Sequence, residues 1–519
     1  MKFNVKREGK KRPDLLLWIL GVLAAAGVAL LLVAANTDLL VKPRSFARLK
    51  LYEGPKPIAA SETAMMKVDG NELFVYDTAV NNTHTWNSRY NPPLSTAQVA
   101  SFDFADGAVT LEITLPGETD LGGVTVRPLA YGIQPEVTGN TIRFQISQPD
   151  VYTVEYQDSP TKAMHIFANA LDDNAPTEST DTVKVIGPGA WLADTMVLED
   201  GMQVYISGGA VIRGTLVGSG VKDVSVSGRG FFDGSHQKSW MLNQRTAYIP
   251  VSLRDCENVS VSGIGILDPN AWCMELYNCD RVTVDGVKIL SARPNGDGIT
   301  VQSCRDVTVK GCFIRSWDDS LVVKNYSNLK GSDSERIVFD GCQLWTDLAQ
   351  SMEVGYETNK GGKLKPVIRD VTFSNITVLH NFHKPVMSIH NADDAEVSDI
   401  RFLNITVEDA SMGKGDAGDN AQLIDLTIDL SSWSTAKQRG TIHDVLFDGI
   451  TVLSGDDTID FKEGNLCPIR IQGYDAEHLC ENVTIRGLTI LGKAVTMENY
   501  AENPDTKVDR FTRNIQFAE

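Results

Sequence analysis

The chain has 519 residues, of which 42% are hydrophobic and 22% are charged, enough for a large core and more than one domain. Its net charge is -19, and the acidic residues are spread along the sequence. Nucleic-acid binding depends on clustered Lys and Arg, so this charge argues against a nucleic-acid partner, and we expect none.

The N-terminal segment predicts export. A basic cluster between Lys6 and Arg12 precedes an apolar run at 15–35, and about 20 apolar residues suffice to span a bilayer. The basic flank predicts a cytoplasmic tail at 1–14, a transmembrane signal anchor at 15–35 and an extracellular remainder. Cleavage after the small residues Val33, Ala34 and Ala35 is the alternative, and the protein would then be secreted. We expect a single-pass cell-membrane protein that is a monomer.

Two different patterns follow the anchor. Residues 36–62 contain Pro43, Pro55 and Pro57 and are predicted to be a linker. From 63 to 170, short strand-like segments alternate with turn signals, and no helical pattern separates them. This spacing predicts an antiparallel β-sandwich domain.

A repeated phrase, apolar–x–Gly or apolar–x–Asn, organises residues 171–519. It recurs at 226–228, 261–263, 284–286, 309–311, 339–341, 373–375, 402–404, 447–449 and 485–487. Steps of about 23 to 45 residues with a strand as the repeated unit predict a β-solenoid, in which each rung stacks on the next. The predicted fold class is therefore all-β: a parallel β-helix preceded by a β-sandwich and a transmembrane helix.

The eight cysteines fit this repeat better than a disulfide framework. Cys256, Cys279 and Cys304 occur in the same local phrase, which predicts small buried thiols at equivalent places in successive rungs. If a disulfide exists, Cys467 and Cys480 are the pair that we expect.

Two acidic corners flank one repeat unit: Asn295-Gly296-Asp297-Gly298 and Asp318-Asp319. In a β-helix they would lie one rung apart on the same side, and neighbouring strands are separated by about 4.8 Å. Three carboxylates this close are not all ionised easily, so at least one pKa should be raised. Hydrolysis of a glycosidic bond by paired carboxylates needs one protonated acid and one ionised base. Each corner alone is also an ordinary turn signal.

From about Val185 to the C-terminus the sequence resembles the polygalacturonase-like β-helix hydrolases, glycoside hydrolase family 28 and its relative family 49 of dextranases and isopullulanases. Ile186-Gly-Pro-Gly189 and Val226-Ser-Gly-Arg-Gly230 look like the first rungs of that family. Asn295–Gly298 is similar to its Asn-Thr-Asp-Gly motif, and Asp318-Asp319 to its Asp-Asp motif. A sandwich before the helix is similar to the family 49 layout.

The resemblance implies a right-handed, pectin-lyase-like parallel β-helix that carries an inverting glycosidase acting on a polysaccharide or oligosaccharide. It implies that Asp318 is the general acid and that Asp297 and Asp319 hold and activate the water. We expect no cofactor and no metal.

The departures from the family pattern bear on the substrate. The position of the histidine in its Gly-His-Gly motif is occupied by Gln350, whose side chain can form hydrogen bonds but cannot take up or release a proton. Its Arg-Ile-Lys motif, which grips the galacturonate carboxylate, falls at Ser388-Ile389-His390 and lacks the bidentate Arg. These losses favour a neutral or differently charged glycan. The residues that we expect to contact substrate are Asn295, Lys324, Gln350, Glu353 and His390.

Several of these residues have a structural alternative. Lys324 and Arg293 could replace the lost cation or form structural salt bridges, and His390 could be a subsite donor or a surface histidine. The aromatic residues near the corners could stack on sugar rings or simply pack; they are Trp272, Trp317, Tyr326 and Tyr356.

Two other functions remain open from the sequence. The chain could be a non-catalytic glycan-binding β-helix that has kept the fold. It could also be a β-helix polysaccharide lyase, which would need a Ca²⁺ cluster and a basic residue as proton abstractor.

Overall fold

The computed structural model describes residues 47–81, 94–240, 246–326, 333–362, 364–410, 422–454, 469–498, 507–508 and 510–518. The predicted tail at 1–14 and anchor at 15–35 lie outside these residues, as does Cys467, so its pairing with Cys480 stays a prediction. Within the described ranges, no helix is both long enough and apolar enough to cross a bilayer.

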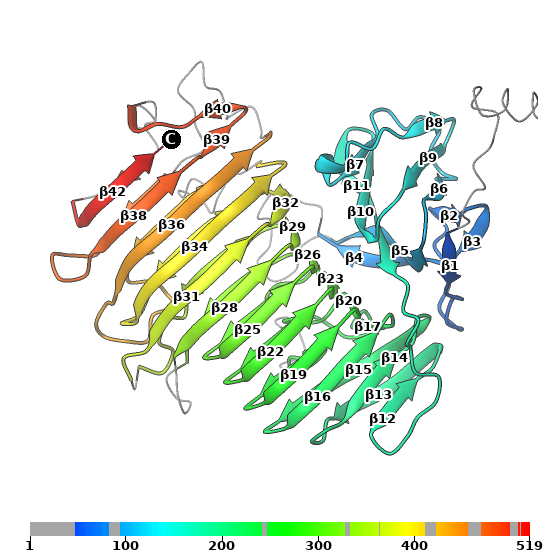
Figure 1. The fold of residues 1–519 in the computed structure, drawn as a ribbon, viewed down its shortest axis with the longest axis horizontal. Helices are drawn as coiled ribbons and strands as arrows, with labels where there is room; N and C mark the ends of the chain where they lie inside the picture. The colour runs from blue at the N-terminus through cyan, green and yellow to red at the C-terminus, as the bar shows by residue number, and fades with distance from the viewer. Residues whose placement is uncertain are drawn as a thin grey trace, which may run out of the picture. The chain divides into compact units, whose positions relative to one another are not determined.

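The N-terminal part of the described chain forms two β-sheets (Figure 1). The six-stranded sheet contains β1 (Arg48–Leu51), β4 (Val75–Val80), β5 (Ser95–Ala105), β7 (Thr125–Arg127), β10 (Asp150–Tyr156) and β11 (Ser159–Ala170). The five-stranded sheet contains β2 (Met65–Val68), β3 (Asn71–Leu73), β6 (Val109–Thr114), β8 (Glu136–Thr138) and β9 (Thr141–Ile146). A short 3-10 helix, η1 (Leu129–Tyr131), follows β7.

These sheets differ from the predicted arrangement in two details. β1 lies inside the segment predicted as a linker, 36–62, and pairs with β5. β11 runs parallel to β5, so the prediction of purely antiparallel strands is wrong for this pair. A parallel pair needs a crossover connection, and the strands β6 to β10 supply it between β5 and β11. Face-to-face packing as a sandwich stays a prediction.

From Val183 onward a 31-stranded sheet winds in chain order, and its pairings are parallel except for β39 with β40 (Figure 1). The strands fall into three stacks. The first stack contains β12 (Val183–Ile186), β14 (Gln203–Ile206), β16 (Lys222–Gly228), β19 (Glu257–Ser262), β22 (Asp280–Asp285), β25 (Arg305–Lys310), β28 (Ser334–Asp340), β31 (Val367–Ser374), β34 (Glu396–Val407), β36 (Thr441–Val452), β38 (Cys480–Arg486) and β42 (Thr512–Ala518).

The second stack contains β13 (Gly189–Val197), β15 (Ala210–Ser219), β17 (Phe231–Asp233), β20 (Gly265–Leu267), β23 (Lys288–Leu290), β26 (Phe313–Ser316), β29 (Gln343–Thr346), β32 (Thr377–Asn381), β39 (Thr489–Ile490) and β40 (Lys493–Ala494). The third stack contains β18 (Val251–Arg254), β21 (Met274–Tyr277), β24 (Ile299–Gln302), β27 (Leu321–Lys324), β30 (Met352–Tyr356), β33 (Met387–Asn391), β35 (Ile424–Ile428), β37 (Ile469–Gln472) and β41 (Lys507–Val508). This architecture confirms the prediction of an all-β chain built on a long parallel sheet.

The repeated Gly or Asn of the sequence phrase turns the chain out of the first stack. Gly286, Gly311 and Gly341 have φ between 57° and 63°, and Asn375 and Asn404 both have φ 53°. Gly enters this left-handed region at no steric cost, and Asn tolerates it better than most residues do. The phrase is therefore a turn signal repeated once per rung.

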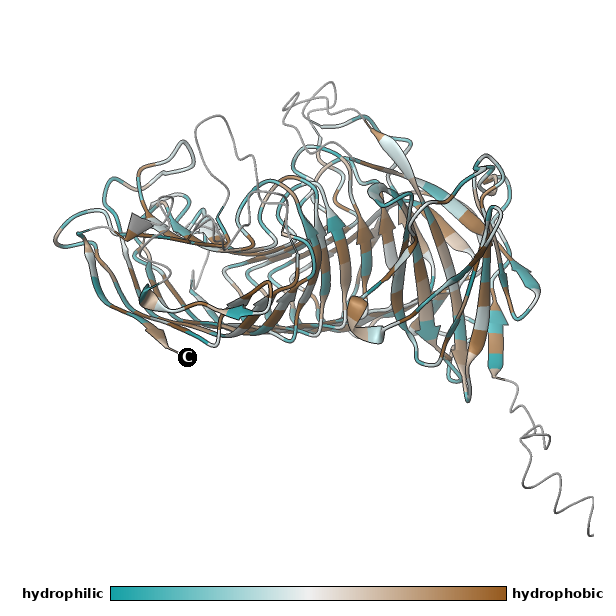
Figure 2. Cartoon of the chain, turned by 90° about the horizontal axis from the view of Figure 1, so that it is seen from above, coloured by the Kyte–Doolittle hydropathy of each residue, from teal (hydrophilic) through white to brown (hydrophobic). Residues whose placement is uncertain are grey.

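The apolar member of the phrase stacks on its equivalents inside the helix. Phe339, Phe373, Phe402 and Phe447 form a column with ring centroids 4.7, 4.9 and 4.7 Å apart and interplanar angles of 8° or less. Hydrophobic and hydrophilic residues alternate along many strands of the sheets (Figure 2). Cys256, Cys279 and Cys304 are buried at equivalent places in three successive rungs.

The six-stranded sheet packs on the second stack. Tyr76 and Phe167 from the sheet share an apolar cluster with Phe231, Phe313 and Trp345 from the helix. Polar contacts also cross this interface, among them Arg127 with Glu408 at 2.9 Å, His380 with Glu155 at 2.5 Å, and Arg315 with His165 at 3.1 Å.

The phenylalanine column gives a direct test of the stacked core. We expect Phe373→Ala to lower the free energy of unfolding by about 3–5 kcal/mol, because the buried ring contacts a neighbour above and below. Denaturant unfolding measures this loss. The control is Thr372→Ala on the outer side of the same strand, for which we expect a loss below about 1 kcal/mol. Equal losses for the two variants would contradict the stacked core.

Candidate active site

Strand register brings the two acidic corners together. Met274 pairs with Ile299, Ile299 with Leu321, and Leu321 with Met352. The positions two residues before these four strand starts are occupied by Trp272, Asp297, Asp319 and Gln350. Asp297 and Asp319 therefore occupy equivalent positions in adjacent rungs of the third stack, as the sequence predicted.

Backbone hydrogen bonds fix the corners against each other. The Asn295 N–H donates to Asp318 Oδ2 at 3.2 Å, and the Asp319 N–H donates to Asp318 Oδ1 at 3.1 Å. The Gly298 N–H donates to the Asp319 carbonyl at 2.8 Å. A Cβ on Gly298 would lie 2.4 Å from the Ser320 carbonyl oxygen, so the close approach of the rungs requires glycine there. The Asn295 contact with Asp318 is thus made through the main chain.

A buried chain of hydroxyl groups runs beneath the Asp318-Asp319 corner. Ser316 Oγ donates to the Asp318 carbonyl at 2.6 Å and lies 2.7 Å from Ser320 Oγ. Ser320 Oγ contacts Thr346 Oγ1 at 2.7 Å, and Thr346 Oγ1 contacts Ser351 Oγ at 2.7 Å. These side chains are fully buried and hold the turns that present the carboxylates.

The three aspartates differ in burial, and the pKa values of the two buried ones are raised. Asp297 and Asp319 are buried, with 2% and 7% of their surface exposed, whereas Asp318 is half-buried. The pKa of Asp297 is raised to about 7, chiefly by burial; Lys324 opposes this rise, and Asp318 and Glu357 contribute to it. Burial, together with Asp318 and Asp297, raises the pKa of Asp319 well above its usual range. The prediction that at least one of these pKa values is raised therefore agrees with the structure, although burial contributes more than the neighbouring carboxylates do.

Lys324 is the cation of the cluster. Its Nζ lies 3.4 Å from Asp297 Oδ2 and 3.3 Å from Glu357 Oε2, and it sits 5.1 Å from the centre of the Trp272 ring. Burial alone would lower the pKa of Lys324, but Glu357, Asp297 and Asp319 together raise it well above its ordinary value. The ammonium is thus paired inside the protein.

Gln350 lies one rung beyond Asp319. Its backbone N–H donates to Asp319 Oδ1 at 3.2 Å, while its side-chain Nε2 is buried and makes no hydrogen bond within the described residues. A buried donor without an acceptor is costly, and it is the kind of group that a bound hydroxyl or water satisfies.

His390 is buried, with 3% of its surface exposed, so the alternative of a surface histidine is wrong. Its Nδ1 contacts Glu353 Oε1 at 2.9 Å, and its Nε2 contacts Asp425 Oδ2 at 3.1 Å. Ser388 Oγ also donates to Glu353, and Arg470 Nε donates to Asp425 Oδ1 at 2.8 Å. His390 and Glu353 therefore belong to an ion network on the third stack.

The remaining candidates are mostly held by protein partners. Arg293 forms a bidentate pair with Asp268, with both contacts at 2.6 Å, so it is a structural salt bridge. Trp317 is buried. Tyr356 stacks on His390 with the ring centres 4.2 Å apart, and Tyr326 packs edge-on against Tyr277.

Sequence reasoning missed Glu357, Asp425 and Arg470. None of them belongs to a local motif, and rungs of unequal length hide their register. Asp425 pairs in register with Ser388, and Arg470 with Asp425, so only the strand alignment identifies them as neighbours of the substituted motif.

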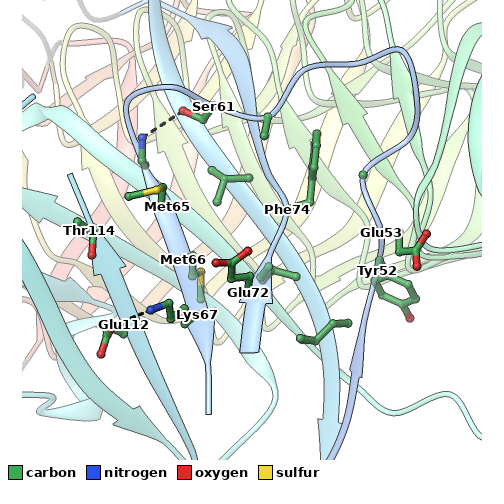
Figure 3. A pocket seen from close by; sticks show the side chains of 16 residues that line it. Tyr52, Glu53, Ser61, Met65, Met66, Lys67, Glu72, Phe74, Glu112 and Thr114 are labelled. Atoms are coloured by element: carbon green, nitrogen blue, oxygen red, sulfur yellow. Dashed lines mark hydrogen bonds and ion pairs between the residues drawn. The ribbon is translucent and has the colours of Figure 1, made fainter. Parts of the chain in front are cut away.

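A separate cavity of about 560 Å³ lies in the N-terminal region and contains none of these residues (Figure 3). Phe74, Met65 and Met66 form part of its wall, and Lys67 pairs with Glu112 at 3.7 Å on one side. In the part of the chain that the structure describes, no three His, Cys, Asp or Glu side chains are grouped so that they could hold a metal ion.

Three kinds of comparison relate the chain to known proteins. Residues 194–496 match the family model described as glycosyl hydrolases family 28. A probable endopolygalacturonase D of Aspergillus flavus is 23% identical over 411 residues, which are 75% of this chain and 74% of that protein. A probable polygalacturonase of Arabidopsis thaliana is 26% identical over 125 residues, 22% of this chain and 28% of that protein.

The chain matches only 28%, 23% and 35% of the lengths of three plant relatives. Among solved structures, Dex49A from Penicillium minioluteum superposes with a TM-score of 0.65 at 14% identity, over 90% of this chain and 96% of that one. This likeness shows a shared fold.

The ion network predicts an unusually high pKa for His390. Burial alone would lower the pKa of His390, but Glu353 and Asp425 raise it to about 10. The folded-state pKa of His390 therefore exceeds the unfolded value of about 6.5. The protonated ring stabilises the fold fully below pH 6.5, and this stabilisation is lost as the pH rises through about 10. We expect long-range ¹H–¹⁵N NMR at pH 8 to show both ring nitrogens of His390 protonated.

His165 is the control in the same spectrum. Burial, with Arg315 and His380 nearby, lowers its pKa well below the usual value, so its ring should be neutral at pH 8. A neutral His390 at that pH would contradict the network.

Proposed function

The chain belongs to the glycosyl hydrolases of family 28, and from this premise we propose that it is an inverting glycoside hydrolase that cleaves a neutral polysaccharide or oligosaccharide outside the cell. In this proposal the parallel rungs coil in the right-handed sense, and the segment 15–35 holds the catalytic domain at the membrane. The substrate is a glycan of the cell wall or the surroundings, and the enzyme needs no cofactor.

One observation carries the catalytic part of the proposal: Asp297 and Asp319 stand in register on adjacent rungs, and Asp318 is tied to the first corner by the Asn295 N–H. Three carboxylates beside a single ammonium, that of Lys324, cannot all be ionised at low cost, so the cluster keeps a proton at neutral pH. Proton donor and proton acceptor are then available in one place.

The exposure of the three aspartates supports the catalytic roles that we assign to them. Asp318 is the least buried of the three, which suits a general acid that must reach the leaving oxygen. Asp297, which Lys324 contacts, accepts one proton of a water molecule that Asp319 helps to hold, and the water oxygen attacks the anomeric carbon from the face opposite the leaving group. The glycosidic bond breaks, the leaving oxygen takes the proton of Asp318, and the anomeric configuration inverts. We assign the holding of this water or of a sugar hydroxyl to Gln350, because its backbone N–H donates to Asp319 and its Nε2 has no partner within the described residues.

Charge pairing on the third stack supports a neutral substrate. His390 lies between Glu353 and Asp425, Arg470 is bonded to Asp425, and Lys324 is shared by two carboxylates. A carboxylate-bearing sugar would have to compete with these internal acids for each cation. A polyuronate therefore gains little here, whereas a neutral sugar needs no such exchange.

The lyase alternative is less well supported. A lyase needs a basic side chain that can accept a proton, and the raised pKa of Lys324 keeps its amine protonated. The non-catalytic binding module remains the alternative that experiment must separate from the hydrolase.

We expect Asp318→Asn to lower kcat by about 10²–10⁴-fold, since an amide cannot donate the proton to the leaving oxygen. Reducing-end release on a panel of glycans measures the loss, and circular dichroism checks folding.

Asp285→Asn is the matched control, because Asp285 is on the first stack and pairs with Lys310 at 3.2 Å. We expect it to keep full activity. Binding of a glycan without reducing-end release by the wild-type protein would instead support the non-catalytic module.

The substrate class has its own test. We expect kcat/KM to be at least about tenfold higher on carboxyl-reduced polygalacturonate, a neutral polygalactose, than on polygalacturonate itself. A carboxylate that finds no free cation needs to cost only about 1.4 kcal/mol to give this ratio. The two polymers share linkage and ring geometry, so they isolate the charge. A preference for the charged polymer would contradict the neutral-substrate proposal.

A further inference from the structure

Lys324 connects a proposed catalytic carboxylate to one that takes no part in the proposed chemistry. Its Nζ lies 3.4 Å from Asp297 Oδ2 and 3.3 Å from Glu357 Oε2. The side chains of Lys324, Asp297 and Glu357 are 8%, 2% and 7% exposed. Two buried anions therefore share one buried cation.

The surroundings limit how this cation can move. The Trp272 ring lies 5.1 Å from Lys324 Nζ and covers one side of it. The Asn325 N–H, on the residue after Lys324, donates to the Glu357 carbonyl at 2.7 Å, which ties the two rungs together. The lysine is thus held between the carboxylates by groups on both sides.

We propose that Glu357 is a positioning residue that acts through Lys324: by sharing this ammonium with Asp297, it sets the pH below which the site loses its base. The inference rests on the proposed function, in which Asp297 accepts the proton of water. Coulomb interactions across a few ångströms of buried protein are large enough to move a carboxyl pKa by a unit or more.

The other charged groups around the pair are fixed by the register. Asp297 faces Asp318 and Asp319 from the turn before β27 and Lys324 from the end of that strand, with Glu357 and Tyr326 also close enough to interact with it. Lys324 also faces Asp319 and Tyr326. Glu357 has a second cation, Lys360, at 3.2 Å, which is 40% exposed. Lys324 is therefore the group that links Glu357 to the proposed base.

The sign of the effect follows from these contacts. Removing the charge of Glu357 leaves the Lys324 ammonium to Asp297 alone and removes a repulsive anion, so the pKa of Asp297 should fall. Removing the ammonium has the opposite effect. A pair that serves only to hold the fold would change stability without moving this titration.

The test is a ¹³C NMR titration of the aspartate carboxyl groups in the full protein without substrate, with Asp297 assigned from the signal that Asp297→Asn removes. We expect the Asp297 signal of Glu357→Gln to titrate about one pH unit below wild type. We expect Lys324→Met to titrate above wild type and Lys324→Arg to remain close to it. If Lys324→Met does not fold, Lys324→Met/Glu357→Gln removes both charges and should also titrate above wild type.

Glu275→Gln is the matched control. Glu275 is equally buried on the same stack but pairs with Arg254, and it should leave the Asp297 titration unchanged. An unchanged Asp297 titration in folded Glu357→Gln would overturn the proposal.

The pH profile of kcat/KM adds a second measurement. The acid limb of this profile should move to lower pH by the same amount in Glu357→Gln, and the plateau value of kcat/KM should be retained. A uniform loss of kcat/KM at all pH values, without an NMR shift, would assign Glu357 a structural role. The NMR shift needs no activity, so a failure of the proposed hydrolase would appear separately, as the absence of reducing-end release.

Discussion

The in-register parallel pairing of the third stack is the constraint on which the proposed site depends. The position two residues before the strand recurs at the same place in four consecutive rungs, so residues far apart in sequence are brought within one strand spacing of each other. Polar groups at the turns before these strands are therefore buried, and most of them find partners nearby, whereas Gln350 Nε2 has none within the described residues. The hydroxyl chain from Ser316 to Ser351 and the main-chain bonds to Asp318 supply such partners.

Charge compensation is the second constraint on the third stack. Buried carboxylates there pair with cations on neighbouring rungs: Glu275 with Arg254, Asp297 and Glu357 with Lys324, and Asp425 with His390 and Arg470. Burying an ion costs several kcal/mol unless it is paired, so these contacts stabilise the fold and at the same time occupy the cations. This pairing is the reason for our proposal that the substrate carries no charge of its own.

The fold was largely predictable because its signals are local and repeated. The apolar–x–Gly phrase marks a left-handed turn in each rung, and its phenylalanines form the column from Phe339 to Phe447. The two acidic corners could be placed together because they flank one regular rung. The parallel pairing of β11 with β5 could not be foreseen, since strand direction in the N-terminal sheets is set by long connections.

The outer parts of the site were harder to predict. Asp425 and Arg470 become neighbours of the substituted Arg-Ile-Lys motif, and Glu357 becomes a neighbour of Lys324, only through the register of rungs of unequal length. His390 could be recognised as a substitution, but its burial between two carboxylates could not, because both partners come from other strands.

The central claim is that Asp297, Asp318 and Asp319 surround one water that attacks the anomeric carbon. Time-resolved ¹H NMR of a cleavage reaction, recorded before mutarotation, measures it most directly through the anomer that forms first. Our account predicts that this anomer has the configuration opposite to that of the bond cleaved. A first product with retained configuration would contradict it, because retention requires a carboxylate, not water, to attack first.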